Sequence, residues 1–178
     1  MAMPFTEYVL LGALMSGPRH GYEIMQFLDT ALGSTWHVGT SQLYALLKRL
    51  EGEGLVSSTL ETQEDRPSKR VFFLTDIGKK SFLVWVHCPI ENVRDIRIEF
   101  LAKLFFFGRL RLKEGDKLVK RQIQVLNKNK ERLRKISENE TNPYNRLVLD
   151  FKMSTVEAWL DWLHMKAKPF IENVRDHG

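Results

Sequence analysis

The strongest structural signal in the chain is the stretch Ser41-Gln-Leu-Tyr-Ala-Leu-Leu-Lys-Arg-Leu-Glu-Gly-Glu-Gly-Leu-Val56. At about 100° per residue, its leucines at 43, 46, 47 and 50 fall on one narrow stripe of a helix, which we expect to face a core. Thr40 or Ser41 can cap the start of this helix, and the glycines at 52 and 54 end it. The sequence therefore predicts a helix over residues 40–53 with one buried face and one open face.

Two shorter helices are predicted before this one. Apolar residues at helical spacing predict helices over residues 8–15 and 21–32, and Ser16-Gly17-Pro18 supplies the turn between them. Gly33 follows the second helix as a C-cap. Three consecutive short helices therefore open the chain, and the third has the polar open face.

The residues after the third helix have the composition of a β-hairpin. Residues 55–60 and 70–75 are rich in β-branched and aromatic side chains, which predicts two antiparallel strands. The polar segment between them contains Pro67, which favours an exposed loop over a strand interior. Thr75 or Asp76 can then cap a fourth helix. Three helices, a hairpin and a helix are the order of a winged helix-turn-helix.

The rest of the chain has helical periodicity throughout. Amphipathic spacing predicts helices over residues 94–110, 115–139 and 144–168, which suggests a lobe for dimerisation. We expect a mainly α fold with a small β-hairpin wing: a winged helix-turn-helix DNA-binding domain over residues 1–87, a linker over 88–93 and a helical dimerisation domain over 94–178. The positions expected at the dimer interface are Val119, Ile123, Leu126, Leu133, Val148, Phe151, Trp159 and Leu163.

The open face of the 40–53 helix has groups suited to DNA. A major-groove helix needs donors that reach base edges and phosphates, and a small residue where the backbone comes close. The candidates are Ser41, Gln42, Tyr44, Ala45, Lys48 and Arg49. Gln pairs bidentately with adenine, and the Tyr hydroxyl can donate to a phosphate. The alternative is that Ser41 only caps the helix and that the two cations form a solvated face.

The hairpin carries three cations at its tip and on its returning strand, namely Arg66, Lys69 and Arg70. Cations at such positions can touch phosphates or enter the minor groove. Three acidic residues precede them and would repel DNA, so only the returning side is a candidate contact. The alternative is an ordinary charged hairpin.

The chain of 178 residues has a net charge of +5 and a pI near 9.3, which suggests a polyanionic partner. The charge is unevenly divided: residues 1–87 have a net charge of −1, and the remaining residues have +6. The basic segment over residues 113–135 is either a solvated face or a surface that flanks DNA and steers association.

The sequence contains no motif for a disulfide, a metal site or the common catalytic sites. The single Cys88 closes no intramolecular disulfide, the five histidines show no HExxH spacing, and no P-loop, GxSxG or GxGxxG occurs. We therefore expect no enzyme activity, no cofactor and no metal site. The sequence also shows no secretion signal and no membrane span, which favours the cytoplasm of the cell.

Four stretches resemble the PadR family of bacterial and archaeal transcriptional regulators. They are Tyr8-Val-Leu-Leu-Gly-Ala-Leu14, His20-Gly-Tyr-Glu-Ile24, Ser41 to Val56, and Lys69-Arg-Val-Phe-Phe-Leu-Thr-Asp-Ile-Gly78. Residues 93–106 are similar to the C-terminal lobe of the longer members, the AphA-like virulence activators.

The resemblance implies a homodimer that binds an inverted-repeat operator in double-stranded DNA. It also implies that His20, Gly21, Tyr22, Tyr44 and Leu50 are signature positions. His20 and Tyr22 stand at the start of the second helix, where outward N–H groups can hold a phosphate. The alternative is that Gly21 permits a tight start to this helix and Tyr22 packs.

Many members of the family are repressors released by a small aromatic or hydrophobic effector, whereas others activate. Trp36 and Trp85 are candidates for an effector pocket, although aromatic residues at helical spacing are more often core or dimer interface. A different class of function is also open, because a winged helix can serve as a protein-interaction module without binding DNA.

Overall fold

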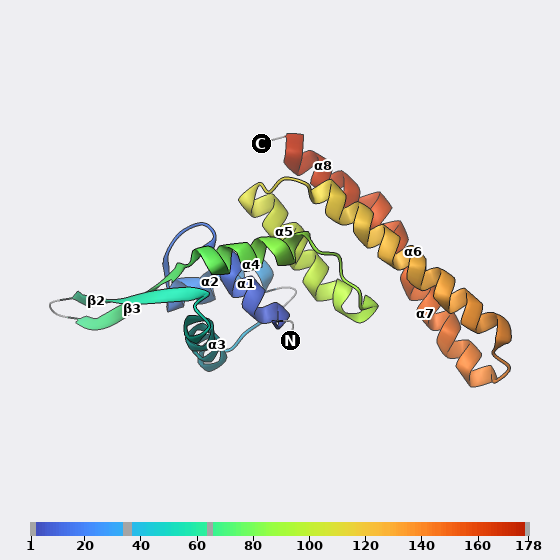
Figure 1. Cartoon of the computed structure of the whole chain (residues 1–178), viewed down its shortest axis with the longest axis horizontal. Helices are drawn as coiled ribbons and strands as arrows, with labels where there is room; N and C mark the ends of the chain where they lie inside the picture. Colours follow the sequence, from blue (N-terminus) through green and yellow to red (C-terminus); the bar gives the residue numbers. More distant parts are fainter. Residues whose placement is uncertain (1–2, 34–36, 64–65, 177–178) are drawn as a thin grey trace. The chain divides into compact units, whose positions relative to one another are not determined.

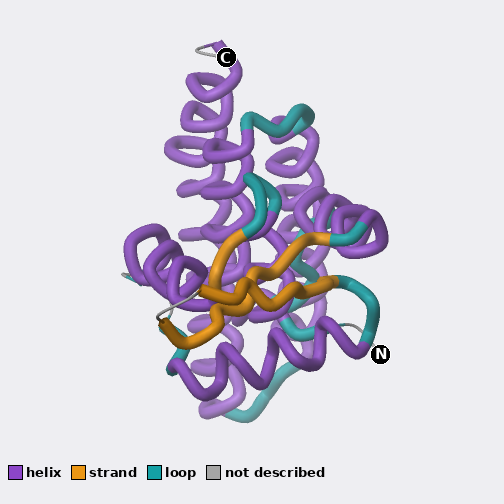
Figure 2. The backbone as a smooth tube through the Cα atoms, turned by 90° about the vertical axis from the view of Figure 1, so that its left-hand side faces the viewer, coloured by secondary structure: helices purple, strands orange, loops and turns teal. Residues whose placement is uncertain are grey.

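The computed structural model describes residues 3–33, 37–63 and 66–176, of which 62–63, 66–68 and 175–176 are described by their backbone alone. The chain divides into two compact units, residues 1–86 and 87–178 (Figure 1). The first unit, which we call the winged unit, holds the three strands that the structure describes. The second, which we call the helical unit, is built from helices (Figure 2).

In its described residues, the winged unit has four helices and a three-stranded antiparallel sheet in the order β1-β3-β2. Its elements are α1 (Phe5–Leu14), β1 (Arg19–His20), α2 (Gly21–Leu32), α3 (Thr40–Gly52), β2 (Val56–Gln63), β3 (Arg66–Leu74) and α4 (Asp76–His87). Leu43, Leu47 and Leu50 of α3 are fully buried, as are Leu10 of α1 and Phe82 of α4. The leucine stripe therefore fixes α3 in the core and turns its other face outward.

The sheet is larger than the sequence predicted. β1 was not expected, and β2 and β3 extend into the segment expected as a loop, so that Pro67 lies inside β3. β1 pairs with β3 only at Arg19↔Phe72 and His20↔Val71. Near Pro67, β3 therefore has β2 as its hydrogen-bonded neighbour and an open side, where proline is tolerated.

The N-cap predicted for α4 is confirmed, whereas the N-cap predicted for α3 is wrong. Thr75 Oγ1 accepts a hydrogen bond of 3.1 Å from the Gly78 N–H, which is the expected cap of α4. The N-cap of α3 is Gly39, which makes no side-chain bond, so neither Thr40 nor Ser41 is the cap. Ser41 is exposed on the first turn of α3 instead.

Trp85 belongs to the core of the winged unit. It is 6% exposed, and its ring stacks on Tyr8 at 5.1 Å between centroids, with Phe5 and Phe82 beside it. This packing agrees with the alternative that Trp85 is a core residue, and none of the hollows described below is lined by it. Trp36, the other candidate, lies outside the described residues.

The helical unit is an antiparallel hairpin of two long helices with shorter helices against it. Its elements are η1 (Val93–Asp95), η2 (Ile96–Phe100), α5 (Leu101–Leu110), α6 (Gly115–Asn139), α7 (Pro143–Trp162), η3 (Leu163–Ala167) and α8 (Lys168–Asp176). α6 and α7 lie side by side (Figure 1). η2 and η3 are π-helical turns that continue directly into α5 and α8.

The α6–α7 hairpin uses several positions that the sequence assigned to a dimer interface. Val119, Leu126, Leu133 and Leu163 are at most 7% exposed within one chain. They pack inside the chain's own helical unit, which corrects the expectation that these four side chains face a second copy. Ile123, Val148 and Trp159 are half-buried, and Phe151 is 73% exposed.

The segment expected as a linker is held inside the helical unit. The buried amide of Gln122 accepts a hydrogen bond from the Ile90 N–H at 2.6 Å and donates one to the Ile90 carbonyl at 2.9 Å. Lys103 Nζ, which is also buried, donates to the Cys88 carbonyl at 2.8 Å. Two buried polar side chains thus hold residues 88–90 of the expected linker in place.

Candidate nucleic-acid interface

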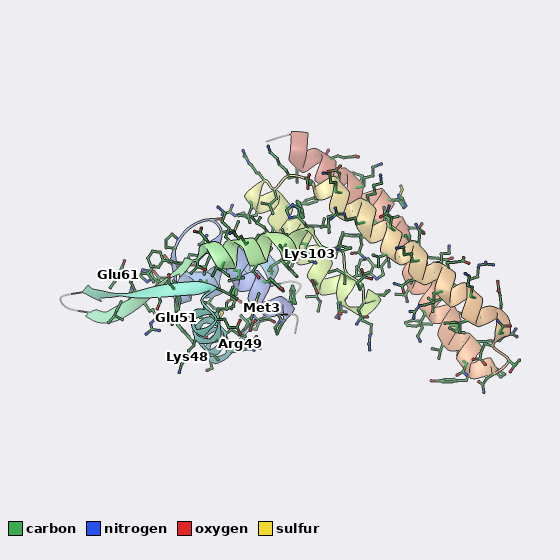
Figure 3. The ribbon with its side chains drawn as sticks, in the orientation of Figure 1. Met3, Lys48, Arg49, Glu51, Glu61 and Lys103 are labelled. Atoms are coloured by element: carbon green, nitrogen blue, oxygen red, sulfur yellow. The ribbon has the colours of Figure 1, made fainter. Side chains whose placement is uncertain are left out.

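The outward face of α3 presents the side chains that the sequence singled out. Ser41, Gln42, Ala45 and Lys48 are all exposed, and Figure 3 shows Lys48 on the outer side of the helix, away from the sheet. The buried leucines on the opposite face hold the helix in place. Because these leucines fix its rotation, α3 offers a short row of hydroxyl, amide, methyl and ammonium groups on one rigid element.

Tyr44 extends this face towards the start of α2. Its ring lies against Gly21 so closely that a Cβ on Gly21 would be 2.5 Å from the Tyr44 hydroxyl oxygen. The residue is nevertheless 46% exposed, so part of its ring remains open to solvent. Gly21 therefore leaves the space that the Tyr44 ring occupies. This one contact explains why glycine and tyrosine stand at these two signature positions.

Arg49 is the clearest departure from the sequence-based assignment. Its guanidinium pairs with the carboxylate of Glu7 in α1, a side chain with no exposed surface, and lies 3.8 Å from Glu53. A buried carboxylate needs its cation, because an unpaired buried charge is strongly destabilising. Arg49 thus joins α3 to α1, a structural contact that the sequence did not indicate, while 48% of its side chain remains exposed.

Arg70 is likewise tied to the fold. Arg70 Nη1 lies 3.3 Å from Glu51 Oε2, and the Ser58 hydroxyl donates to the other oxygen of the same carboxylate at 2.5 Å. Glu51 therefore connects the end of α3 to both strands of the hairpin (Figure 3). Arg70 is 53% exposed, but this pairing positions the wing and reduces the charge available to a phosphate.

His20, Tyr22 and Lys69 come together between the start of α2 and the wing. The rings of His20 and Tyr22 stack at 5.6 Å, and Lys69 Nζ lies 5.3 Å from the centre of the Tyr22 ring. His20 Nε2 is 3.7 Å from Glu61 Oε2 on β2. Lys69 is half-buried and its ammonium lies over the ring face, from where it can still contact a phosphate.

The remaining wing candidate is placed only in part. The backbone of Arg66 lies in β3, paired with Gln63, while its side chain lies outside the described residues. Sequence reasoning missed Glu7 and Glu51, the carboxylates that engage Arg49 and Arg70. Glu7 carries no local signal for this role, because α1 and α3 are brought together only by the fold.

Among the described residues, neither a group of metal ligands nor a membrane-spanning helix is present. Within the described ranges, no group of three His, Cys, Asp or Glu side chains is arranged to hold a metal ion. None of the helices that the structure describes combines the length and apolar character needed to cross a lipid bilayer.

Comparison with known proteins assigns the chain to a family. Residues 10–83 match the Transcriptional regulator PadR-like family, and residues 96–165 match the Virulence activator alpha C-term family. The negative transcriptional regulator PadR of Bacillus subtilis is 35% identical over 125 residues, which cover 68% of this chain and 67% of that protein. The chain belongs to the PadR-like family of transcriptional regulators. Its function is therefore of the regulatory class and not enzymatic.

Two further proteins are similar to this PadR-like chain. The probable transcriptional regulator Rv1176c of Mycobacterium tuberculosis is 29% identical over 94 residues, which cover 53% of this chain and 48% of that protein. The crystal structure of B. subtilis PadR in complex with operator DNA is 29% identical and covers 92% of this chain and 97% of its own, with a TM-score of 0.48.

Proposed function

We propose that this PadR-like chain is a homodimeric, sequence-specific repressor that binds an inverted-repeat operator. The observation that carries the proposal is the row Ser41, Gln42, Ala45 and Lys48 on the exposed face of α3, which buried leucines hold in one orientation. α3 enters the major groove, with Gln42 at a base edge and Lys48 at a phosphate. The similarity to a negative transcriptional regulator supports repression as the sign of the effect.

The wing contributes backbone or minor-groove contacts beside this helix. Lys69 of β3 lies over the ring of Tyr22, at the start of α2, and the two side chains contact the DNA backbone together. Tyr44 of α3 packs against Gly21, the residue before Tyr22, and so lies beside them. Arg66 stands nearer the hairpin tip, where a wing reaches furthest.

The dimer forms through the outer face of the continuous helix made by α7 and η3. Tyr144, Leu147, Phe151 and Met165 are each at least 65% exposed and share one side of this helix at spacings of three, four and fourteen residues. Two hollows of about 330 and 400 Å³ occur in the same unit, and both are lined by Leu101 and Trp162. Large exposed apolar side chains and apolar hollows suit a second copy of the same surface, because a two-fold interface must be self-complementary.

A small aromatic or hydrophobic effector releases the repressor in this proposal. A cavity of about 460 Å³ in the helical unit falls in the size range of small-molecule sites. Phe107, Leu112, Ile171 and Val174 supply its apolar walls. The His87 ring packs edge-on against Phe107 at 5.1 Å, so an occupant that moves Phe107 would also disturb this ring.

The proposal is tested by selecting binding sites for the purified chain from a pool of random duplexes. Recovery of an inverted repeat whose half-sites are about 10 bp apart, or a multiple of that, supports it. Recovery of no preferred sequence, together with salt-independent capture of a purified protein by α3 or the wing, would favour the protein-interaction module. Promoter fusions to the selected site then separate repression from activation.

The effector is tested by adding a panel of phenolic and hydrophobic aromatic compounds to the protein–DNA complex. A compound that releases the wild-type chain but not a Val174→Trp variant, whose cavity is filled, supports the assignment. Equal release of both variants would place the effector elsewhere.

A further inference from the structure

The winged unit has no excess of positive charge. Residues 1–87 have a net charge of −1. Of the cations expected on its DNA-binding surface, Arg49 and Arg70 are in ion pairs with carboxylates, whereas Lys48 and Lys69 are in no salt bridge among the described residues. Lys48 is the α3 cation that remains for a phosphate. Protein–DNA affinity depends strongly on neutralised phosphates, so further cations are expected elsewhere on the chain.

The helical unit has those cations, and α6 concentrates them. Residues 88–178 have a net charge of +6. From Lys117 to Lys130, α6 has five basic residues and no acidic residue. An ordinary solvated helix has both signs interspersed, so this stretch is unusually one-sided.

The cations of α6 also share one side of the helix. At about 100° per residue, six of them fall within about 60° on either side of a single line. They are Lys117, Lys120, Arg121, Lys128, Arg132 and Lys135, all exposed. Leu126 and Leu133, which are buried on the opposite side of the helix that packs against α7, fix this stripe outward. We call these six residues the α6 basic stripe.

Part of the stripe is free of salt bridges. Among the described residues, no carboxylate lies within salt-bridge distance of Lys120, Arg121, Lys128 or Arg132. By contrast Lys130, which lies off the stripe, is paired with Glu157 of α7 at 2.8 Å. Within the stripe, Lys117 is paired with Glu114 and Lys135 Nζ lies 3.8 Å from Glu131, so four of the six cations remain outside salt bridges among the described residues.

We infer that the α6 basic stripe is a second DNA-contacting surface, which binds phosphates of the duplex that flanks the site held by α3. This inference rests on the proposed DNA-binding function. From Lys117 to Arg132 the helix rises by about 22 Å, which is about two thirds of one helical turn of B-DNA. The stripe contacts the backbone without reading bases, so it increases affinity and association rate for all sequences.

The test compares a stripe variant, Lys120→Glu/Arg121→Glu/Lys128→Glu, with a matched control, Arg146→Glu/Lys152→Glu/Lys168→Glu. Both variants change three exposed cations of the helical unit and have the same net charge. The probe is a duplex selected by the wild-type chain, with and without about one extra helical turn of unrelated sequence on each side. If no sequence is preferred, a random duplex of the longer length serves instead.

We expect the stripe variant to bind the longer duplex at least tenfold more weakly at low salt. The slope of log K against log salt should become shallower by about 0.9 for each phosphate that the variant no longer neutralises, whereas the control should change much less. The wild-type chain should also gain affinity from the flanking turns, and the stripe variant should not. Equal effects of the two variants, or an unchanged slope in the stripe variant, would overturn the inference.

These outcomes are distinct from failure of the proposed function. If the wild-type chain selects no sequence but the stripe variant still loses salt-dependent binding to random duplex, the α6 surface stands and sequence-specific recognition fails. If the wild-type chain selects an operator and both variants bind it alike, recognition by α3 stands and the α6 surface fails. Light scattering on both variants checks that neither change alters the oligomeric state.

Discussion

Arg49, on the partly exposed side of α3, is paired with the fully buried carboxylate of Glu7 in α1. The pair joins the proposed recognition helix to the first helix of the winged unit. Its neighbour Lys48 points outward and is in no salt bridge among the described residues. Two adjacent cations on one helix therefore have different roles, one in the fold and one at its surface.

This difference predicts unequal effects of two neighbouring substitutions on stability. Arg49→Ala leaves the buried Glu7 without its cation, and we expect a loss of about 1–3 kcal/mol, reduced from the cost of a fully buried pair because Arg49 is half exposed. Lys48→Ala should change the free energy of unfolding by no more than about 0.5 kcal/mol. Urea unfolding of both variants measures the two values. An Arg49→Ala variant as stable as the wild type would contradict the structural role of the pair.

The outward face of α3 predicts two different losses in DNA binding. Gln42→Ala should cost about 1–3 kcal/mol at the preferred sequence and relax the preference at one base position. Lys48→Ala should weaken binding to preferred and random duplexes alike and make the salt dependence shallower. Titration of both variants against the selected and scrambled duplexes gives the comparison. A uniform loss in both variants would remove Gln42 from the base-contacting role.

The contact between Gly21 and Tyr44 predicts that the effect of a Gly21 substitution on DNA affinity depends on the presence of Tyr44. In Gly21→Ala the new methyl group displaces the Tyr44 ring, which can move because it is half exposed, so stability should change by less than about 1 kcal/mol. DNA affinity should nevertheless fall, because Tyr44 leaves its position beside the start of α2. In a Tyr44→Ala background the same Gly21→Ala change should have no further effect on DNA affinity. A double-mutant cycle on binding checks this coupling, and additive losses would refute it.

The buried and exposed apolar residues of the helical unit predict different outcomes on substitution. Leu126→Ala, which empties a buried position in α6, should destabilise the chain by about 2–5 kcal/mol. Leu147→Glu/Phe151→Glu should shift the proposed dimer to monomer, and its unfolding transition should match that of the wild type only at concentrations low enough for the wild type to be monomeric as well. Light scattering and thermal unfolding on both variants, with Lys152→Glu as an exposed control, make the comparison. A Leu147→Glu/Phe151→Glu variant with the wild-type mass would move the interface elsewhere.

Lys103 predicts a change of stability with pH. Burial lowers the pKa of this ammonium below its ordinary value of 10.5, although Glu99 at 3.1 Å opposes the shift. Between the lowered pKa and 10.5 the unfolded chain binds more protons than the folded chain, so stability contributed by Lys103 rises with pH in that window. Lys103→Met should remove this rise, whereas the exposed Lys152→Met should retain it. Unfolding midpoints at several alkaline pH values test the difference, and parallel curves for all three proteins would be inconsistent with a buried cation.

The helices of the winged unit were predictable because their evidence is local. Leucines at 43, 47 and 50 recur at the helical period, and the glycines at 52 and 54 end the pattern, so the identity of the buried face follows from spacing alone. The extent of the sheet was not predictable in the same way. β1 is only two residues long and exists because β3 lies beside it, and Pro67 is tolerated in β3 because β1 stops short of it.

In the helical unit, too, the sequence pattern did not predict which segment packs against which. The heptad-like pattern of α6 predicts that one face is apolar, but the pattern is identical whether the partner helix belongs to the same chain or to another. The structure places α7 there, with Leu126 and Leu133 buried within one chain and Phe151 outward.

The helical elements, the winged order, the outward row on α3 and the family resemblance all follow from residues near one another in the chain, so the amino-acid sequence was enough to predict them. Which cations are free became known only from the packing of distant segments. Glu7 and Arg49, or Glu51 and Arg70, become partners because the fold brings them together, and an ion pair depends on distance in space. On the expected DNA-binding surface of the winged unit, Arg49 and Arg70 are therefore engaged in ion pairs, whereas four exposed cations of α6 are in no salt bridge among the described residues.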